Sequence, residues 1–181
     1  MGVTNAHEKP DPALLVRDVP DFPRPGVVFK DITPLLAAPG ALAQVVDDLA
    51  ALAVRLEVDL IAGVEARGFL FGAPVAVAAE SGFVPIRKPG KLPSATLGVD
   101  YALEYGTDRL ELHVDGVEAG HRVLLVDDVL ATGGTAAASI QLLGQAGAEV
   151  VGAAFVLEIE GLGGRSALDV PVHVVLGAGA S

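Results

Sequence analysis

The sequence contains no cysteine among its 181 residues. This absence excludes disulfide bonds, cysteine nucleophiles and zinc sites built on thiolates, and it is compatible with a cytoplasmic protein. Aromatic residues are also scarce, at 4%, so valine, leucine, isoleucine and alanine have to fill the hydrophobic core. With 51% hydrophobic and 19% charged residues, the chain is expected to fold as a single globular domain over residues 1–181.

Long uncharged hydrophobic runs are missing as well. No stretch approaches the roughly 18 apolar residues that a membrane-spanning helix needs. The polar start of the chain, MGVTNAHEKPDP, lacks the apolar segment of a secretory signal. We therefore expect a cytoplasmic protein that does not associate with a membrane.

Basic residues are few: the sequence has 12 lysines and arginines against 23 acidic residues, which gives a net charge of −11. This balance disfavours nucleic acid as a partner, since a phosphate backbone demands a basic surface. Four of the basic residues nevertheless fall close together in the sequence, namely Arg67, Arg87, Lys88 and Lys91. They predict a locally positive site for a phosphorylated substrate, although ordinary solvated surface charges would give the same pattern.

The most informative segment is VLLVDDVLATGGT, which runs from Val123 to Thr135. Its first four residues are typical of a buried parallel strand, and a helix-like segment follows its last residue. Between them lies a loop of small residues and hydroxyls, formed by Ala131, Thr132, Gly133, Gly134 and Thr135. Backbone N–H groups at the start of a helix favour an anion, so the loop predicts a phosphate site. A plain strand-to-helix turn is the alternative.

Two adjacent carboxylates, Asp127 and Asp128, stand directly before this loop. They are suited to sugar hydroxyls or a metal ion, so the segment predicts a sugar phosphate rather than a bare anion. Neighbouring residues of a strand point to opposite faces. We therefore expect the pair at the end of the strand, where both side chains can turn toward a ligand, or one of them serving only as a cap.

Strand-like and helix-like segments alternate along the chain. Strands are expected at 59–64, 83–86, 109–114, 123–126, 150–157 and 172–176, helices at 12–19, 39–56, 69–80, 135–145 and 161–168, and a long polar loop with some extended structure at 87–108. This order predicts an α/β fold with a mostly parallel central sheet flanked by helices. Ligands of such sheets lie beyond the carboxyl ends of the strands, where 65–68, 87–91 and 127–135 fall.

The segment VLLVDDVLATGGT resembles the signature of type I phosphoribosyltransferases. Four further segments resemble stretches of the adenine phosphoribosyltransferase family: FPRPGVVFKDITPLL, GVEARGFLFGAPVA, VPIRKPGKLPSATL and YALEYGTDRLELH. The resemblance covers about 21–164. It implies a type I phosphoribosyltransferase fold with a small N-terminal hood, about 1–34, and a mobile catalytic loop, about 88–108.

The same resemblance implies an activity. The 5-phosphoribosyl group of phosphoribosyl pyrophosphate would pass to adenine, giving AMP and pyrophosphate in cytoplasmic purine salvage. It also implies a homodimer and Mg²⁺ as cofactor, bound mainly through the substrate rather than by direct protein ligands. Two alternatives stay open from the sequence: transfer to another purine, and a regulator that senses phosphoribosyl pyrophosphate on the same fold.

The resemblance also implies roles for individual residues. The loop Glu65–Gly68, with a non-proline cis peptide at Glu65–Ala66, would take the pyrophosphate group. The other residues implied for the sugar donor or AMP are Arg67, Arg87, Lys88, Lys91, Tyr105, Asp127, Asp128 and Ala131 to Thr135. Glu104 would transfer the proton of adenine. Val28, Lys30 and Ile159 would surround the base, with Lys30 acting through its side chain or its backbone.

Overall fold

The computed structural model describes residues 10–102 and 106–177, which form two compact units, 10–45 and 46–177. The first unit contains η1 (Pro12–Leu15), β1 (Arg17–Pro20), β2 (Val28–Asp31) and α1 (Thr33–Ala37). A longer helix, α2 (Pro39–Arg55), begins in the first unit and ends in the second. None of the helices in the described part of the chain is long and apolar enough to cross a membrane.

The first unit is built around an antiparallel hairpin. Strands β1 and β2 pair from Arg17 opposite Asp31 to Pro20 opposite Val28. The expected helix over 12–19 is therefore wrong beyond its first turn. Asp11 caps that turn by accepting a hydrogen bond from the Ala13 N–H at 2.9 Å. The chain then leaves the helical conformation, because pairing with β2 outweighs the weak local preference.

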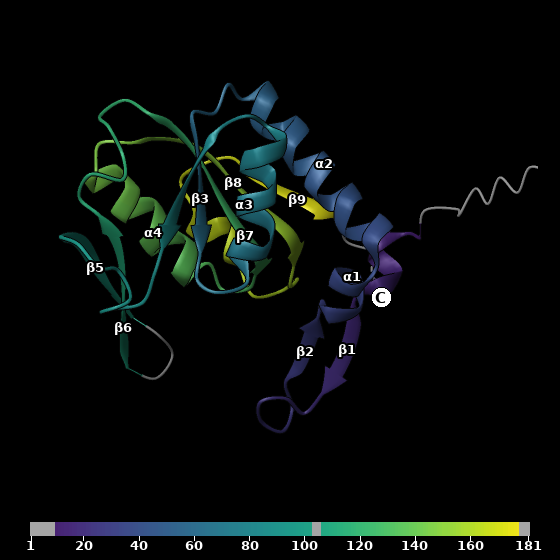
Figure 1. Cartoon of the computed structure of the whole chain (residues 1–181). Coiled ribbons are helices and arrows are strands. Elements are labelled where there is room, and N and C mark those ends of the chain that lie inside the picture. The colour runs from purple at the N-terminus through teal and green to yellow at the C-terminus, as the bar shows by residue number, and fades with distance from the viewer. Residues whose placement is uncertain (1–9, 103–105, 178–181) are drawn as a thin grey trace, which may run out of the picture. The chain divides into compact units, whose positions relative to one another are not determined.

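The second unit is an α/β sandwich, as the alternation of segments predicts. Its elements are β3 (Leu60–Val64), α3 (Gly68–Ala78), β4 (Gly82–Ile86), β5 (Thr96–Ala102), β6 (Thr107–His113), β7 (Arg122–Leu130), α4 (Gly134–Gln145), β8 (Glu149–Glu158), η2 (Gly164–Ala167) and β9 (Val172–Leu176). Five strands form one parallel sheet in the order β4-β3-β7-β8-β9. The antiparallel hairpin of β5 and β6 stands beside it (Figure 1).

Helices cover both faces of this sheet, with α3 and α4 on opposite sides (Figure 1). On one side, Ala62, Leu125 and Phe155 pack with Leu142 and Leu143 of α4 in a continuous buried core. On the other side α3 approaches β3 so closely that Gly72 lies 3.4 Å from the Cα of Gly63, measured from the position of an ideal Cβ. The alternation of side chains along each strand produces these two faces.

Three further expected elements differ from those observed by more than two residues at one end or in their type. Strand β7 continues to Leu130 rather than ending at Val126, because β8 pairs with it as far as Glu158. The expected polar loop over 87–108 contains all of β5 and the start of β6. The expected helix over 161–168 is only the single 3-10 turn of η2.

Candidate functional site

A cavity of about 240 Å³ opens at the carboxyl ends of the parallel strands, where the topology predicts a ligand. Strands β3 and β7 pair as far as Gly63 opposite Val126, and β7 then continues beside β8 alone. The chain after β3 turns away at that point, which leaves space between the two strands. The lining is Glu65, Ala66, Arg67, Lys88, Asp127 to Ala136 and Phe155.

The two adjacent carboxylates both line this cavity. The expectation that they stand at the end of their strand is wrong, because β7 continues two residues past Asp128. They share the cavity nonetheless, since β7 has lost its β3 neighbour there. Gly68 allows the start of α3 to approach the backbone of β7 closely, because a Cβ at this position would lie 2.8 Å from the Val126 carbonyl oxygen.

Burial governs the electrostatics of this acidic pair. The pKa of Asp127 is raised well above its usual value, first by burial and then by the neighbouring charge of Asp128. Burial also raises the pKa of Asp128, which is only 3% exposed, although Arg67 opposes the shift. The Nε atom of Arg67 lies 2.9 Å from Oδ2 of Asp128. Negative charge on this pair therefore costs free energy, and the attraction to Arg67 offsets only part of that cost.

The predicted phosphate loop lies on the same cavity, and every one of its residues from Ala131 to Thr135 is part of the lining. Its shape depends on Gly133, whose φ of +85° belongs to the left-handed region that favours glycine. Helix α4 starts at the next residue, and its first three residues, Gly134, Thr135 and Ala136, line the cavity. The first N–H groups of a helix lack partners within it, which suits an anion.

The expected cis peptide is present between Glu65 and Ala66. The Glu65 carboxylate accepts two hydrogen bonds from Arg87, at 3.2 Å from Nε and 3.0 Å from Nη2. It also accepts one from the backbone N–H of Lys88 at 2.9 Å. The Arg87 hydrogen bonds are the main reason that the pKa of Glu65 is lowered. Glu65 thus joins the loop after β3 to the segment after β4.

The four predicted cations do not share one environment. Arg67 and Lys88 line the cavity, whereas Arg87 is held by Glu65 and donates from Nη1 to the Lys91 carbonyl at 3.1 Å. Neither Arg87 nor Lys91 contributes to the lining. Their contact with pyrophosphate stays a prediction. The observed hydrogen bonds of Arg87 fix the loop at Glu65 to the segment that contains Lys91.

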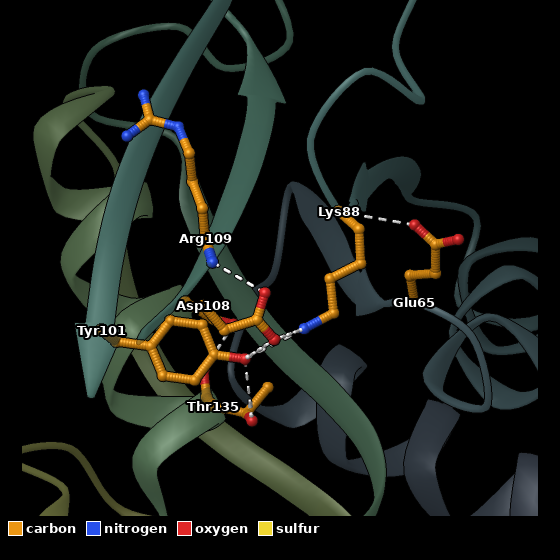
Figure 2. A network of polar contacts seen from close by, with 7 residues as sticks. Glu65, Lys88, Tyr101, Asp108, Arg109 and Thr135 are labelled. Atoms are coloured by element: carbon orange, nitrogen blue, oxygen red, sulfur yellow. Dashed lines mark hydrogen bonds and ion pairs between the residues drawn. The ribbon is translucent and has the colours of Figure 1, made fainter. Parts of the chain in front are cut away.

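A polar network surrounds the side chain of Lys88 (Figure 2). Its ammonium donates to the Tyr101 hydroxyl at 3.1 Å and forms an ion pair with Asp108. The Tyr101 hydroxyl donates to Oδ2 of Asp108 at 3.2 Å and lies 3.5 Å from Oγ1 of Thr135. The network therefore links the β5–β6 hairpin to the first turn of α4.

The residues expected around the base come from two separate segments of the chain. Val28 and Lys30 belong to β2 of the first unit, where Lys30 pairs with Asp18 at 2.7 Å. Ile159 follows β8, and its backbone N–H donates to the Leu130 carbonyl at 2.8 Å. The expected catalytic residue Glu104 and its neighbour Tyr105 lie outside the described residues. Contact between any of these residues and adenine stays a prediction.

Sequence reasoning assigned no role to Tyr101, Asp108 or Phe155. Tyr101 belongs to an alternating series with Leu97 and Val99, of which the latter is buried in the core. That alternation is a strand signal, but the glycines and charges around it made the segment resemble a loop. The sequence around Phe155 predicts only a core residue, because an apolar residue of a central strand normally serves for packing.

The comparisons with known proteins agree with this geometry. A model of the phosphoribosyl transferase domain matches residues 35–174. Adenine phosphoribosyltransferase of Synechococcus sp. (strain CC9605) is 56% identical over 163 residues, which cover 89% of this chain and 95% of that protein. The enzyme of Streptomyces coelicolor is 58% identical over 154 residues, covering 85% of each.

Solved structures give the same result. Adenine phosphoribosyltransferase of Thermoanaerobacter pseudethanolicus is 48% identical with a TM-score of 0.88, covering 91% of this chain and 96% of that one. The Saccharomyces cerevisiae enzyme, solved with adenine and an imino-altritol bisphosphate, is 40% identical with a TM-score of 0.87, covering 91% and 96%. Because a family model matches most of the chain and these relatives share its sequence and its fold, the chain belongs to the adenine phosphoribosyltransferase family.

Proposed function

We propose that this chain transfers the 5-phosphoribosyl group from phosphoribosyl pyrophosphate to adenine, giving AMP and pyrophosphate in purine salvage. The observation that carries the proposal is a single cavity that combines a helix-start loop, an acidic pair and the cis-peptide loop. Relatives at 56–58% identity are adenine phosphoribosyltransferases. The yeast relative was solved with adenine itself, which supports adenine as the base.

The lining suggests how the donor is arranged. The backbone N–H groups of Ala131 to Thr135 take the 5′-phosphate, with the start of α4 adding its dipole. Asp127 and Asp128 accept hydrogen bonds from the ribose hydroxyls. The loop at Glu65–Arg67 and the side chain of Lys88 take the pyrophosphate group. The cavity thus offers two sites for phosphate groups, which fits a donor with an anionic group at each end.

The reaction exchanges one bond at C1′ of the ribose for another. The bond from C1′ to the pyrophosphate oxygen breaks, and its electron pair leaves with pyrophosphate. A bond from N9 of adenine to C1′ forms, and the N9 proton passes to Glu104 in our proposal. Positive charge develops on the sugar during the exchange, and the nearby carboxylates of Asp127 and Asp128 stabilise it.

Magnesium fits the donor atoms of the cavity. Among the described residues no group of three or more potential metal ligands comes together. Asp127 and Asp128 offer carboxylate oxygens, and Mg²⁺ is commonly held by one or two carboxylates together with substrate phosphates. We therefore expect the ion to be bound mainly through the substrate, with this pair nearby. It would there neutralise charge on the pyrophosphate group.

A homodimer and a cytoplasmic location complete the proposal. Helix α3 exposes Leu70 and Val77, which lie two turns apart on one face, and Val77 is 81% exposed. Such side chains suit a surface that a second copy covers. Light scattering coupled to gel filtration should give twice the mass of the 18.3 kDa chain. A monomer at micromolar concentration would contradict the dimer and leave the transferase proposal intact.

The activity is tested by incubating the protein with phosphoribosyl pyrophosphate, Mg²⁺ and each purine in turn. Separation of the products by chromatography should show AMP forming faster than IMP, GMP or XMP, with one pyrophosphate released for each AMP. A matched incubation without Mg²⁺ tests the cofactor. Faster formation of any other nucleotide would refute adenine as the base, and no nucleotide from any purine would refute the transferase.

A further inference from the structure

The side chain of Lys88 is shared between two parts of the second unit. Its main chain is fixed at the cavity, because the backbone N–H donates to the Glu65 carboxylate at 2.9 Å. Its ammonium points to the β5–β6 hairpin, where it meets Asp108 and Tyr101 (Figure 2). The flexible stem between these points lets the charge move while the backbone stays in place.

Asp108 owes its position to the register of the hairpin. It lies directly opposite Tyr101, and the next inward-facing pair is Val99 with Leu110. Asp108 is therefore a carboxylate at the end of an otherwise apolar inner face. Hydrogen bonding to Lys88 is the main reason that the pKa of Asp108 is lowered. Burial alone would lower the pKa of Lys88, but the hydrogen bonds to Asp108 and Tyr101 raise it. Both partners are therefore charged at neutral pH.

The Asp108 carboxylate does not depend on Lys88 alone. Its Oδ2 accepts a hydrogen bond from the Tyr101 hydroxyl at 3.2 Å. Its Oδ1 accepts one from the Arg109 backbone N–H at 2.8 Å. If the ammonium moved away, both oxygens would keep a donor. The side chain of Lys88 is 38% exposed and that of Asp108 28%, so water also reaches the pair. A half-exposed ion pair of this kind is weak and easily exchanged.

We propose that Asp108 is the internal counter-ion of Lys88, which holds the ammonium in the empty site and yields it to the pyrophosphate group when that group binds. The inference rests on the proposed function and assigns Asp108 as a residue that sets the affinity for the donor. A pyrophosphate group carries more charge than one carboxylate, so it wins the exchange. Because the exchange opposes binding, Asp108 weakens the hold on both the donor and the product pyrophosphate.

The test measures the binding of inorganic pyrophosphate, with Mg²⁺ present, by titration calorimetry. We expect Asp108→Asn to tighten binding by about fivefold to tenfold, because the ammonium is no longer neutralised. The amide oxygen can still accept from the Arg109 N–H, and the amide NH2 can donate to the Tyr101 hydroxyl oxygen, so the hairpin should stay folded. Asp100→Asn is the matched control: it removes the same charge from β5, at a side chain that is 68% exposed and pairs with Arg109. It should change the affinity by less than about twofold.

A second background separates counter-ion exchange from general repulsion. Lys88→Gln should weaken pyrophosphate binding, and Asp108→Asn added to it should cause no further change. If Asp108→Asn alone left binding unchanged or weaker, the inference would be overturned. A tightening that persisted without Lys88 would overturn it too, because Asp108 would then act only as a distant negative charge.

The kinetic counterpart is measured in the AMP-forming reaction. Asp108→Asn should lower the KM for phosphoribosyl pyrophosphate while the KM for adenine stays within about twofold of the wild-type value. A wild-type protein that forms no AMP would refute the proposed function rather than this inference. A wild-type protein that forms AMP, with a variant whose donor KM is unchanged, would refute the inference alone.

Discussion

The carboxylates around the cavity fall into two groups whose pKa values shift in opposite directions. Burial raises those of Asp127 and Asp128. Hydrogen bonds from Arg87 and Lys88 lower those of Glu65 and Asp108. The first group is arranged for something that arrives with hydrogen-bond donors or positive charge, such as a ribose or a metal ion. The second group already has its partners: Glu65 joins the loop after β3 to the segment after β4, and Asp108 holds the Lys88 ammonium. In this cavity the raised pKa values belong to the proposed ribose site, and the lowered values belong to carboxylates that already have cationic partners, which we call its frame.

Glu104→Gln should have the largest effect, because it removes the proposed proton acceptor from the reaction itself. Turnover should fall by about 10²- to 10⁴-fold while the affinity for phosphoribosyl pyrophosphate stays close to that of the wild type. Steady-state kinetics and calorimetry measure the two quantities separately. Near-normal turnover would remove Glu104 from the mechanism, and a large loss of donor affinity would move it to the binding residues.

Asp128→Asn should weaken donor binding, whereas Asp108→Asn, a change in the frame, should tighten it. Donor affinity should fall by about tenfold to a hundredfold, because a charged acceptor for the ribose is lost. Stability should not fall, since the buried carboxylate costs free energy in the folded state and the amide removes that cost. The two measurements are calorimetry with phosphoribosyl pyrophosphate and thermal unfolding at pH 7.

Unchanged donor affinity in Asp128→Asn would contradict its assignment to the ribose. A marked drop in Tm would contradict the division into two groups, because Asp128 would then behave as part of the frame. Asp100→Asn, which removes an exposed carboxylate of β5, is the control for the change in net charge.

The pH dependence should separate the groups again. The folded pKa of Asp127 is raised, so Asp127 takes up a proton above its usual 3.8 as the pH falls. Donor affinity should therefore weaken while the fold is intact. Glu65 and Asp108 have lowered pKa values, so their stabilisation is present above their unfolded values and is lost only as the pH falls through the lowered folded ones.

Donor affinity and Tm measured from pH 7 to pH 3.5 test this order of events. Because the phosphates of the donor also titrate, the control is a variant with both Asp127→Asn and Asp128→Asn, whose residual pH dependence belongs to the ligand. Simultaneous loss of affinity and fold in the wild type would contradict the separation.

The smallest effect is expected for Glu65→Gln. An amide accepts fewer hydrogen bonds than the carboxylate that now binds Arg87 twice and Lys88 once. The free energy of unfolding should fall by about 1 kcal/mol, discounted for the partial exposure of Arg87. Urea denaturation measures the change. A variant as stable as the wild type that nevertheless bound donor poorly would place Glu65 with the binding residues.

Part of this site can be predicted from the sequence. The phosphate loop and the acidic pair are contiguous in the chain, so one segment displays them together and their common cavity follows from the strand-loop-helix order. The parallel sheet follows from the alternation of segments. The cis peptide at Glu65–Ala66 was expected only through the family resemblance.

The frame could not be predicted in this way, because its contacts join distant residues. The pairing of Asp108 with Tyr101 depends on hairpin register, and a segment with Gly98 and Asp100 did not look like a strand. Asp127 and Asp128 lie inside β7 because β8 pairs with it as far as Leu130, and no local pattern encodes that contact. Where β3 stops pairing with β7 is likewise not encoded locally. The hydrogen bonds between Glu65 and Arg87 likewise join residues that are 22 positions apart in the sequence.

A crystal structure with AMP bound would show where the phosphate, the ribose and the base lie. We expect the 5′-phosphate on the backbone N–H groups of Ala131 to Thr135 and the ribose hydroxyls on Asp127 and Asp128. We expect adenine within reach of the residues that the family resemblance assigns to the base. A phosphate bound at another part of the cavity would contradict the phosphate loop, and a ribose that avoids the acidic pair would contradict the role of Asp127 and Asp128.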